Sequence, residues 1–233
     1  NGPLLLAHAK TNCNLILSTG MATLGEVEEA LGVLAFGLTN DRDLEPSKLA
    51  FQQAFFSKNG YKVLKNKVTI LHCTTEYPAP LNEINLNAIQ TLYNAFGLKT
   101  GYSDHSKGII IPIAATAMGA TVLEKHFTLD KTLPGPDHKA SLEPNELKAM
   151  VEAIRAVEQS IGSGLKGPTL SEVNNRLVAR KSLVAVRNIM KGEEFTKENI
   201  AVKRPGSGVS PMKYWNTLGK LAQKNHLEDE IIK

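Results

Sequence analysis

The segment from Lys99 to Leu142 constrains the fold more than any other part of this sequence. It contains two short strand-like runs, each followed by a histidine, with a largely apolar helix between them. A Gly/Pro-rich loop that ends in Asp137 follows the second run. A strand, a helix and a second strand form a βαβ unit with parallel strands. The polar residues then collect at the carboxyl ends of these strands, where ligands bind in parallel α/β sheets.

The same alternation continues on both sides of this segment. Four short apolar runs that end in polar loops are predicted strands: 14–18, 68–73, 100–103 and 121–125. Each is followed by a predicted helix: 23–34, 81–96, 108–118 and 144–161. Alternating strands and helices predict an α/β fold with a parallel sheet. The short strands favour a (β/α)8 barrel over a doubly wound sheet, and four units make up half of such a barrel.

Three further segments complete the predicted organisation. A helix is expected at 3–10, and the polar segment 36–67 is interpreted as an insertion with one short helix at 47–56. We predict a barrel-half domain over 1–162, a linker over 163–178 and a small β-rich module over 179–233.

Composition is that of an ordinary globular protein and excludes few classes. Of 233 residues, 42% are hydrophobic and 21% charged, with a net charge of +4. No basic run with interleaved aromatic residues indicates nucleic-acid binding, and no apolar run reaches the length of a membrane span. Cys13 and Cys73 lie in or beside predicted strands, so we expect two buried thiols in a reducing compartment. The cytoplasm is the expected location.

His105 and His126 are the candidate metal ligands. Each follows the end of a neighbouring strand, so both imidazoles could face one ion. The alternative is that each ring only satisfies a backbone carbonyl. Asp104 and Glu124 could orient the imidazoles or could form ordinary ion pairs. His72 lies within its strand and is interpreted as a packed polar residue.

Three hydroxyl residues, Ser18, Thr75 and Ser103, also lie where strands end. Hydroxyl and loop N–H groups at such positions can hold a phosphate or carboxylate. Serine and threonine also cap helices and turns routinely, so this purely structural role stays open.

Tyr77, Asp137 and Arg204 are the remaining candidates. Tyr77 could offer its phenol to a polar ligand, and Asp137 could act as a base, an acid or an acceptor for a sugar hydroxyl. Arg204 precedes a tight turn and could clamp an anion. Packing for the tyrosine and solvent exposure for the two charged residues are the alternatives. The residues alone thus indicate a phosphate- or sugar-binding half barrel with a metal, and no particular reaction.

Six short motifs occur in an order that resembles the sialic acid synthase family, the N-acetylneuraminate and related nonulosonate synthases. They are Ile-Leu-Ser-Thr-Gly-Met21, Leu-His-Cys-Thr-Thr-Glu-Tyr-Pro78, Gly-Tyr-Ser-Asp-His-Ser106, Leu-Glu-Lys-His-Phe-Thr128, Pro-Gly-Pro-Asp137 and Val-Lys-Arg-Pro-Gly206. The tail from about Lys181 is similar to the antifreeze-like (SAF) domain of that family.

The resemblance implies a transferase that condenses phosphoenolpyruvate with an N-acyl amino sugar such as N-acetylmannosamine and releases phosphate. A divalent metal, manganese or alternatively magnesium, would polarise the open-chain aldehyde. By position, His105 and His126 match the metal ligands of the family. Ser18 and Ser103 match residues that hold phosphoenolpyruvate, and Thr75 stands where some members carry asparagine.

The resemblance also assigns Tyr77, Asp137 and Arg204 to the amino sugar, as the candidate catalytic residues. Family members form a domain-swapped homodimer in which the tail of one chain caps the barrel of the other, so Arg204 would act in the partner's site. The sequence aligns with the last four strands of an eight-stranded barrel, from which we expect a part of a longer synthase.

Several alternatives stay open at the level of sequence. Within the family, the product could be legionaminic or pseudaminic acid, made from 2,4-diacetamido-trideoxy sugars. Synthases of octulosonate or heptulosonate phosphates lack the antifreeze-like tail, so the segment from Lys181 to Lys233 argues against them. A non-catalytic sugar-binding fragment is the alternative from another functional class.

Overall fold

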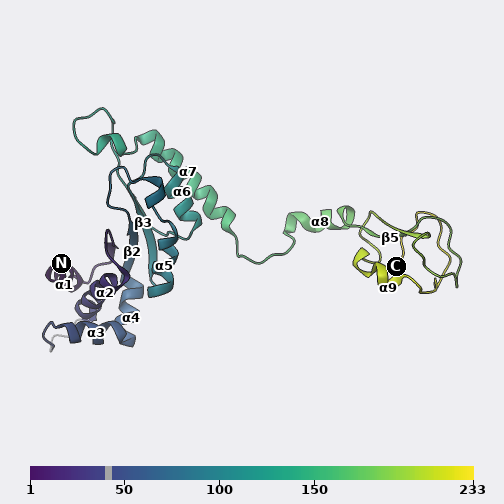
Figure 1. The fold of residues 1–233 in the computed structure, drawn as a ribbon, viewed down its shortest axis with the longest axis horizontal. Coiled ribbons are helices and arrows are strands. Elements are labelled where there is room, and N and C mark those ends of the chain that lie inside the picture. The colour runs from purple at the N-terminus through teal and green to yellow at the C-terminus, as the bar shows by residue number, and fades with distance from the viewer. Residues whose placement is uncertain (40–43) are drawn as a thin grey trace. The chain divides into compact units, whose positions relative to one another are not determined.

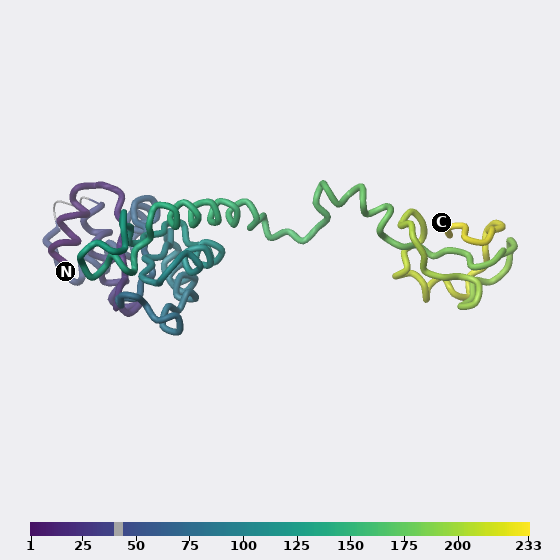
Figure 2. The backbone as a smooth tube through the Cα atoms, turned by 90° about the horizontal axis from the view of Figure 1, so that it is seen from above, coloured from purple at the N-terminus to yellow at the C-terminus, as the bar shows by residue number. Residues whose placement is uncertain are grey.

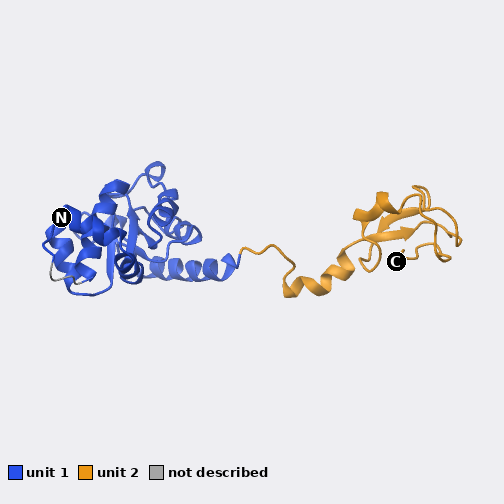
Figure 3. Cartoon of the chain, turned by 90° about the horizontal axis from the view of Figure 1, so that it is seen from below, with its two compact units in different colours: residues 1–163 blue, residues 164–233 orange. Residues whose placement is uncertain are grey.

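The computed structural model describes residues 1–39 and 44–233. The chain divides into two compact units, residues 1–163 and 164–233, shown in separate colours in Figure 3. Each unit has its own buried core and is described by itself.

The first unit is built on a parallel sheet in the order β1-β2-β3-β4. Its strands are β1 (Leu15–Ser18), β2 (Val68–Cys73), β3 (Lys99–Asp104) and β4 (Leu123–Lys125). Every neighbouring pair is parallel and consecutive in sequence, which is the arrangement of a (β/α) barrel segment. The expected α/β half barrel is therefore confirmed.

In the described residues of this unit, seven helices accompany the sheet: α1 (Gly2–Lys10), α2 (Leu24–Thr39), α3 (Lys48–Phe56), α4 (Lys58–Lys67), α5 (Asn87–Phe96), α6 (Ile110–Ala117) and α7 (Pro144–Ile161). Short 3-10 turns lie at Leu81–Glu83 and His138–Ala140. The ribbon of Figure 1 shows α5, α6 and α7 beside β2 and β3. In the tube of Figure 2, the chain coils tightly through this unit.

The two faces of the sheet differ in what covers them. Side chains alternate along a strand, so Leu17, Ile70, Tyr102 and Leu123 all face the helices, where they join apolar clusters. The residues between them face the other way, and Ile16 of β1 is exposed there. We call these the helix-covered face and the open face.

The segment 36–67 differs most from its prediction. The helix predicted to end at 34 continues to Thr39, the helix at 47–56 is confirmed as α3, and α4 follows it directly. Residues 40–43 of the predicted insertion lie outside the described residues. Leu64 of α4 is fully buried in the core, and the Ser57 hydroxyl accepts the Gly60 N–H at 2.8 Å as a helix cap. The described part of the insertion is thus a packed pair of helices, α3 and α4, between α2 and β2.

Helix ends elsewhere follow local chemistry. The predicted helix 81–96 is interrupted, because Asn85 adopts a φ of 50°, and only α5 is α-helical. Gly97 ends α5 with a φ of 63°, a conformation that glycine adopts without strain. Glu26 and Thr23 form a capping box at the start of α2, with the Thr23 N–H donating to the Glu26 carboxylate at 2.7 Å.

The second unit begins with a helix, α8 (Leu170–Ala179), in the segment predicted to be a linker. Thr169 and Glu172 form a capping box that starts it, a signal present in the sequence. Beyond it lie the antiparallel pair β5 (Ser182–Ala185) and β6 (Ile200–Lys203), a 3-10 turn (Pro211–Lys213) and α9 (Tyr214–Thr217). Their core consists of Leu183, Ala185, Ile189, Phe195, Ile200, Ala222 and Ile232.

Two expectations about the surface can be compared with the structure. Cys73 is buried as expected, whereas Cys13 is exposed, because it lies between the turn after α1 and the start of β1. None of the helices in the described residues combines the length and apolar character that a membrane span requires.

Candidate functional site

The candidate site lies at the carboxyl end of the sheet, on its open face. The strand register places Cys73, Ser103 and Glu124 side by side, one on each of three neighbouring strands. His105 and His126 each follow these residues by two positions, so they point to the same face one step beyond the strand ends. Sequence alternation and parallel register thus bring both histidines to one place.

Tyr77 joins the two histidines. Its hydroxyl lies 2.6 Å from Nε2 of His105 and 2.8 Å from Nε2 of His126. The phenol ring stacks on the His105 ring, with centroids 3.9 Å apart. The loop that carries Tyr77 is fixed by the Ala79 N–H, which donates to the His105 carbonyl at 3.0 Å. Both Nε2 atoms therefore converge on one oxygen atom.

The orientation of the His105 ring is fixed from behind. Its Nδ1 lies 2.7 Å from the Thr74 carbonyl oxygen, which can only accept, so Nδ1 carries the proton and Nε2 keeps its lone pair. Partial burial, assisted by neighbouring His126, lowers the pKa of His105. Burial likewise raises the pKa of Tyr77, which stays a neutral phenol. The site therefore presents a neutral imidazole, the form that binds metals.

Asp104 and Glu124 form no hydrogen bond with either imidazole in the described structure. The Glu124 carboxylate accepts the Ser103 hydroxyl at 2.6 Å. Asp104 forms a buried ion pair with Lys125, with 2.6 Å between Nζ and Oδ2. Of the two readings of Asp104, the structure favours the ion pair. Ser103 Oγ also lies 3.4 Å from Nε2 of His105, so this hydroxyl borders the site.

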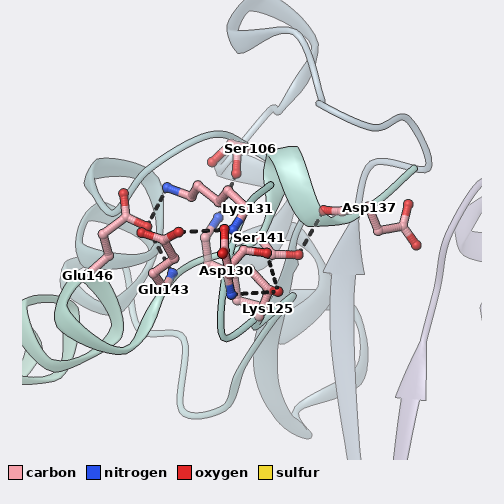
Figure 4. A network of polar contacts seen from close by, with 9 residues as sticks. Ser106, Lys125, Asp130, Lys131, Asp137, Ser141, Glu143 and Glu146 are labelled. Carbon is pink, nitrogen blue, oxygen red and sulfur yellow. Dashed lines mark hydrogen bonds and ion pairs between the residues drawn. The ribbon is translucent and has the colours of Figure 1, made fainter. Parts of the chain in front are cut away.

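Asp137 lies on the loop between β4 and α7. Its carboxylate Oδ2 is 3.9 Å from Nδ1 of His126 and is largely exposed. Its carbonyl accepts the Ser141 hydroxyl at 2.8 Å, and in Figure 4 its carboxylate points away from the polar network that holds the loop. The backbone of Asp137 is thus anchored while its carboxylate is free to meet a ligand.

Thr75 lies close to the loop that follows Ser18 at the end of β1. Thr75 Oγ1 is 3.4 Å from the position that a Cβ on Gly20 would take, two residues after Ser18. His72, in contrast, packs on the helix-covered face, with Nε2 2.6 Å from the Ile84 carbonyl oxygen. Its interpretation as a packed polar residue is confirmed.

Arg204 belongs to the second unit. Its Nε donates to the Ala179 carbonyl at the end of α8 at 3.1 Å, and its side chain is exposed. The other candidates all belong to the first unit.

The histidine pair fits a divalent metal with two protein ligands. A metal accepts imidazole lone pairs at about 2.0–2.1 Å, and both Nε2 atoms already point at one atom. The described residues contain no group of three or more His, Cys, Asp or Glu side chains placed to hold an ion.

The comparison with family models decides where this chain belongs. The NeuB family matches residues 1–166, and the SAF domain matches residues 180–233. The chain belongs to the NeuB family. The expected family and the expected C-terminal domain are both confirmed.

Relatives of known name support this membership. The chain is 51% identical over its whole length to the N,N'-diacetyllegionaminic acid synthase of Campylobacter jejuni and spans 63% of that protein. It is 39% identical over 97% of its length to the enzyme of the same name from Legionella pneumophila, of which it spans 57%. The N-acetylneuraminate-9-phosphate synthase of Homo sapiens is 39% identical over 73% of this chain and 48% of its own length. The chain thus spans about half to two thirds of these relatives.

Solved structures agree with the fold. The N-acetylneuraminic acid synthetase of Leptospira borgpetersenii, in complex with citrate, matches 74% of this chain and 51% of its own, with a TM-score of 0.59 and 35% identity. A spore coat polysaccharide biosynthesis protein of Bacillus subtilis matches the whole chain and 63% of its own, with a TM-score of 0.54 and 34% identity.

Lys125 is the residue that sequence reasoning missed. It stands between Glu124 and His126 at the end of β4. The signal was available, because a lysine whose neighbours face the open side must itself face the apolar side and needs a buried partner there.

Proposed function

We propose that this chain forms part of a synthase that condenses phosphoenolpyruvate with an N-acyl amino sugar, releasing phosphate and forming a nonulosonic acid. The names of the NeuB relatives support this reaction class. The observation that carries the proposal is the convergence of two imidazole Nε2 atoms on one point at the carboxyl end of a parallel half barrel.

A divalent ion, manganese or alternatively magnesium, would be held there by His105 and His126. When bound, it would supply Lewis-acid polarisation of the sugar aldehyde. The Tyr77 hydroxyl lies between the two Nε2 atoms, so its phenol would have to turn aside for an ion to contact both. The Thr74 carbonyl keeps the His105 ring in the ligating tautomer throughout.

The remaining residues divide between the two substrates. Ser18, Thr75 and Ser103 would hold the phosphate and carboxylate of phosphoenolpyruvate through hydroxyl groups at the strand ends. The Ser103 hydroxyl donates to the Glu124 carboxylate at 2.6 Å in the structure, so it would have to turn from Glu124 to donate to phosphoenolpyruvate. The hydrogen bond to Glu124 orients the Ser103 side chain at the edge of the site.

Tyr77 and Asp137 would contact the amino sugar. The exposed Asp137 carboxylate can accept a hydrogen bond from a sugar hydroxyl. It lies 3.9 Å from Nδ1 of His126, so a sugar bound there would lie next to the proposed metal ligand. Arg204 would reach the sugar from the partner chain of a domain-swapped homodimer. Arg204 is exposed and belongs to the separate second unit, which is compatible with such delivery.

For the acceptor we favour a 2,4-diacetamido-trideoxy sugar, the legionaminic alternative, over N-acetylmannosamine. The diacetyllegionaminic acid synthase of Campylobacter jejuni is 51% identical over the whole chain, against 39% over part of it for the human N-acetylneuraminate-9-phosphate synthase. A cytoplasmic location and the absence of nucleic-acid or membrane partners stay predictions.

The test uses the protein that contains this chain. Phosphate release from phosphoenolpyruvate is measured with Mn²⁺ and each of three acceptors: the 2,4-diacetamido sugar, N-acetylmannosamine and its 6-phosphate. We expect the largest kcat/KM with the diacetamido sugar. Turnover with N-acetylmannosamine alone would overturn the acceptor assignment, and sugar binding without phosphate release from any of them would overturn the reaction.

A further inference from the structure

The last registered pair of β3 and β4 is Asp104 opposite Lys125. Each of these residues immediately precedes one of the two site histidines. Their side chains form an ion pair with Nζ and Oδ2 2.6 Å apart, and they are only 0% and 4% exposed, for Asp104 and Lys125. This is the most deeply buried ion pair among the described residues.

The pair lies on the opposite side of the sheet from the histidines. Asp104 follows Tyr102 by two positions, and Lys125 follows Leu123 by two, so both point to the helix-covered face. Lys131 is the main cause of the lowered pKa of Glu146 in α7, and the charge of Lys125 adds to it from this face. The ammonium group of Lys125 therefore does not reach a ligand on the open face.

The same two side chains also hold the backbone beyond His105. Asp104 Oδ1 accepts the Ser106 N–H at 2.8 Å, and Lys125 Nζ donates to the Ser106 carbonyl at 2.6 Å. Ser106 and Lys125 appear together in the network of Figure 4. His105 is thus fixed on both sides, at Asp104 and at Ser106, by contacts that also join it to the strand end before His126.

We propose that Asp104 and Lys125 are positioning residues that set the separation of the His105 and His126 imidazoles and so determine metal affinity. The inference rests on the proposed function for the identity of the ligand. The ion pair fixes the register at the ends of two strands from the helix-covered face of the sheet. Because the histidines are the next residues and lie on the open face, their Nε2 atoms can converge only while this register holds.

The central variant is Lys125→Met, which removes the ammonium group and keeps most of the aliphatic chain. Asp104→Asn is the second variant, which removes the charge and keeps the shape. The matched control is Lys131→Met, which removes the partner of Glu146 in a half-exposed ion pair of the following loop. Mn²⁺ affinity is measured by calorimetry, well below the melting temperature of each variant.

We expect both pair variants to weaken Mn²⁺ binding by at least about tenfold, as loss of groups that orient metal ligands does. The control should stay within about twofold, because it breaks an exposed pair. Unchanged affinity in either folded pair variant would overturn the proposal. If Lys125→Met does not fold, Asp104→Asn decides.

A second readout separates this proposal from the proposed function. The ¹⁵N and ¹³C shifts of the His105 and His126 rings in the metal-free protein report their contact with Tyr77. These shifts should move in both pair variants and stay in place in Lys131→Met. If the wild-type protein binds no Mn²⁺, the proposed metal site fails, and the ring shifts still decide whether the ion pair positions the histidines.

Discussion

The two faces of the β3–β4 strand ends use similar polar residues for different purposes. On the helix-covered face, the charges of Asp104 and Lys125 are buried and fully engaged with each other and with Ser106. On the open face, His105, His126 and Tyr77 meet with little cover, and Tyr77 is 38% exposed. Asp104 and Lys125 are each directly followed in sequence by the histidine that lies on the other face.

This difference follows from the pleat of the strand and from burial. A buried charge on the helix-covered face cannot be left without a partner, so it adopts one geometry and holds it. Groups on the open face can exchange partners with water or a ligand at low cost. The helix-covered face is therefore suited to fixing positions and the open face to binding, and the following variants test this division.

The largest effect on stability should come from the helix-covered face. Lys125→Met leaves the carboxylate of Asp104 buried without its partner, which should lower the free energy of unfolding by about 3–5 kcal/mol. Urea denaturation measures this change. Lys131→Met should cost at most about 1 kcal/mol, because that pair is partly exposed. Equal losses in the two variants would remove the distinction between buried and exposed pairs.

The apolar double variant Asp104→Leu/Lys125→Met sharpens the same comparison. Replacing both charges by apolar side chains removes the unpaired carboxylate, so most of the lost stability should return. The N–H and carbonyl of Ser106 stay without their partners, and metal affinity should therefore remain low. Recovery of both stability and metal affinity would show that the ion pair has no positioning role.

A variant on the open face should instead change metal affinity more than stability. His126→Ala removes a proposed ligand and should weaken Mn²⁺ binding by about 100-fold or more, beyond the loss that supporting residues cause. The melting temperature should change little, because His126 is partly exposed and in contact mainly with Tyr77. Calorimetry gives the affinity, and His8→Ala on the exposed side of α1 is the control. Unchanged affinity would contradict the ligand assignment.

Gly101→Ala tests how closely the open face is packed below the site. A Cβ there would lie 2.3 Å from the Val122 carbonyl oxygen and 2.5 Å from Cδ2 of Leu71. We expect a loss of about 1–3 kcal/mol in unfolding free energy from this overpacking. Gly25→Ala, where a Cβ meets nothing within 4 Å, is the matched control and should not lower stability. A stable Gly101→Ala variant would show that β2, β3 and β4 can move apart.

Ser103→Ala should have the smallest effect. It removes a hydroxyl that donates to Glu124 at 2.6 Å, and water can reach the exposed Glu124 in its place. We expect an effect of about 1 kcal/mol, which corresponds to about a fivefold rise in KM for phosphoenolpyruvate. Steady-state kinetics at saturating sugar measures it. A change in kcat alone would place Ser103 in the chemical step instead of in binding.

The sequence predicted the parts of this molecule that depend on local patterns. Apolar runs located the four described strands of the first unit, and the positions of His105 and His126 after strand ends predicted their proximity. What it could not supply depends on contacts across the fold. The helix α4 has only two buried residues, Gly60 and Leu64, so its apolar pattern is too sparse to predict a helix there. The partner of Lys125 lies 21 residues away and is fixed by strand register.

The most direct test of this account is the place where manganese binds. Crystals of the protein that contains this chain are soaked in Mn²⁺, and anomalous diffraction is recorded at the manganese edge. We predict one peak within coordination distance of Nε2 of His105 and Nε2 of His126, with the Tyr77 hydroxyl displaced from its position between them. A peak at other residues, or an unoccupied histidine pair at saturating Mn²⁺, would contradict the account.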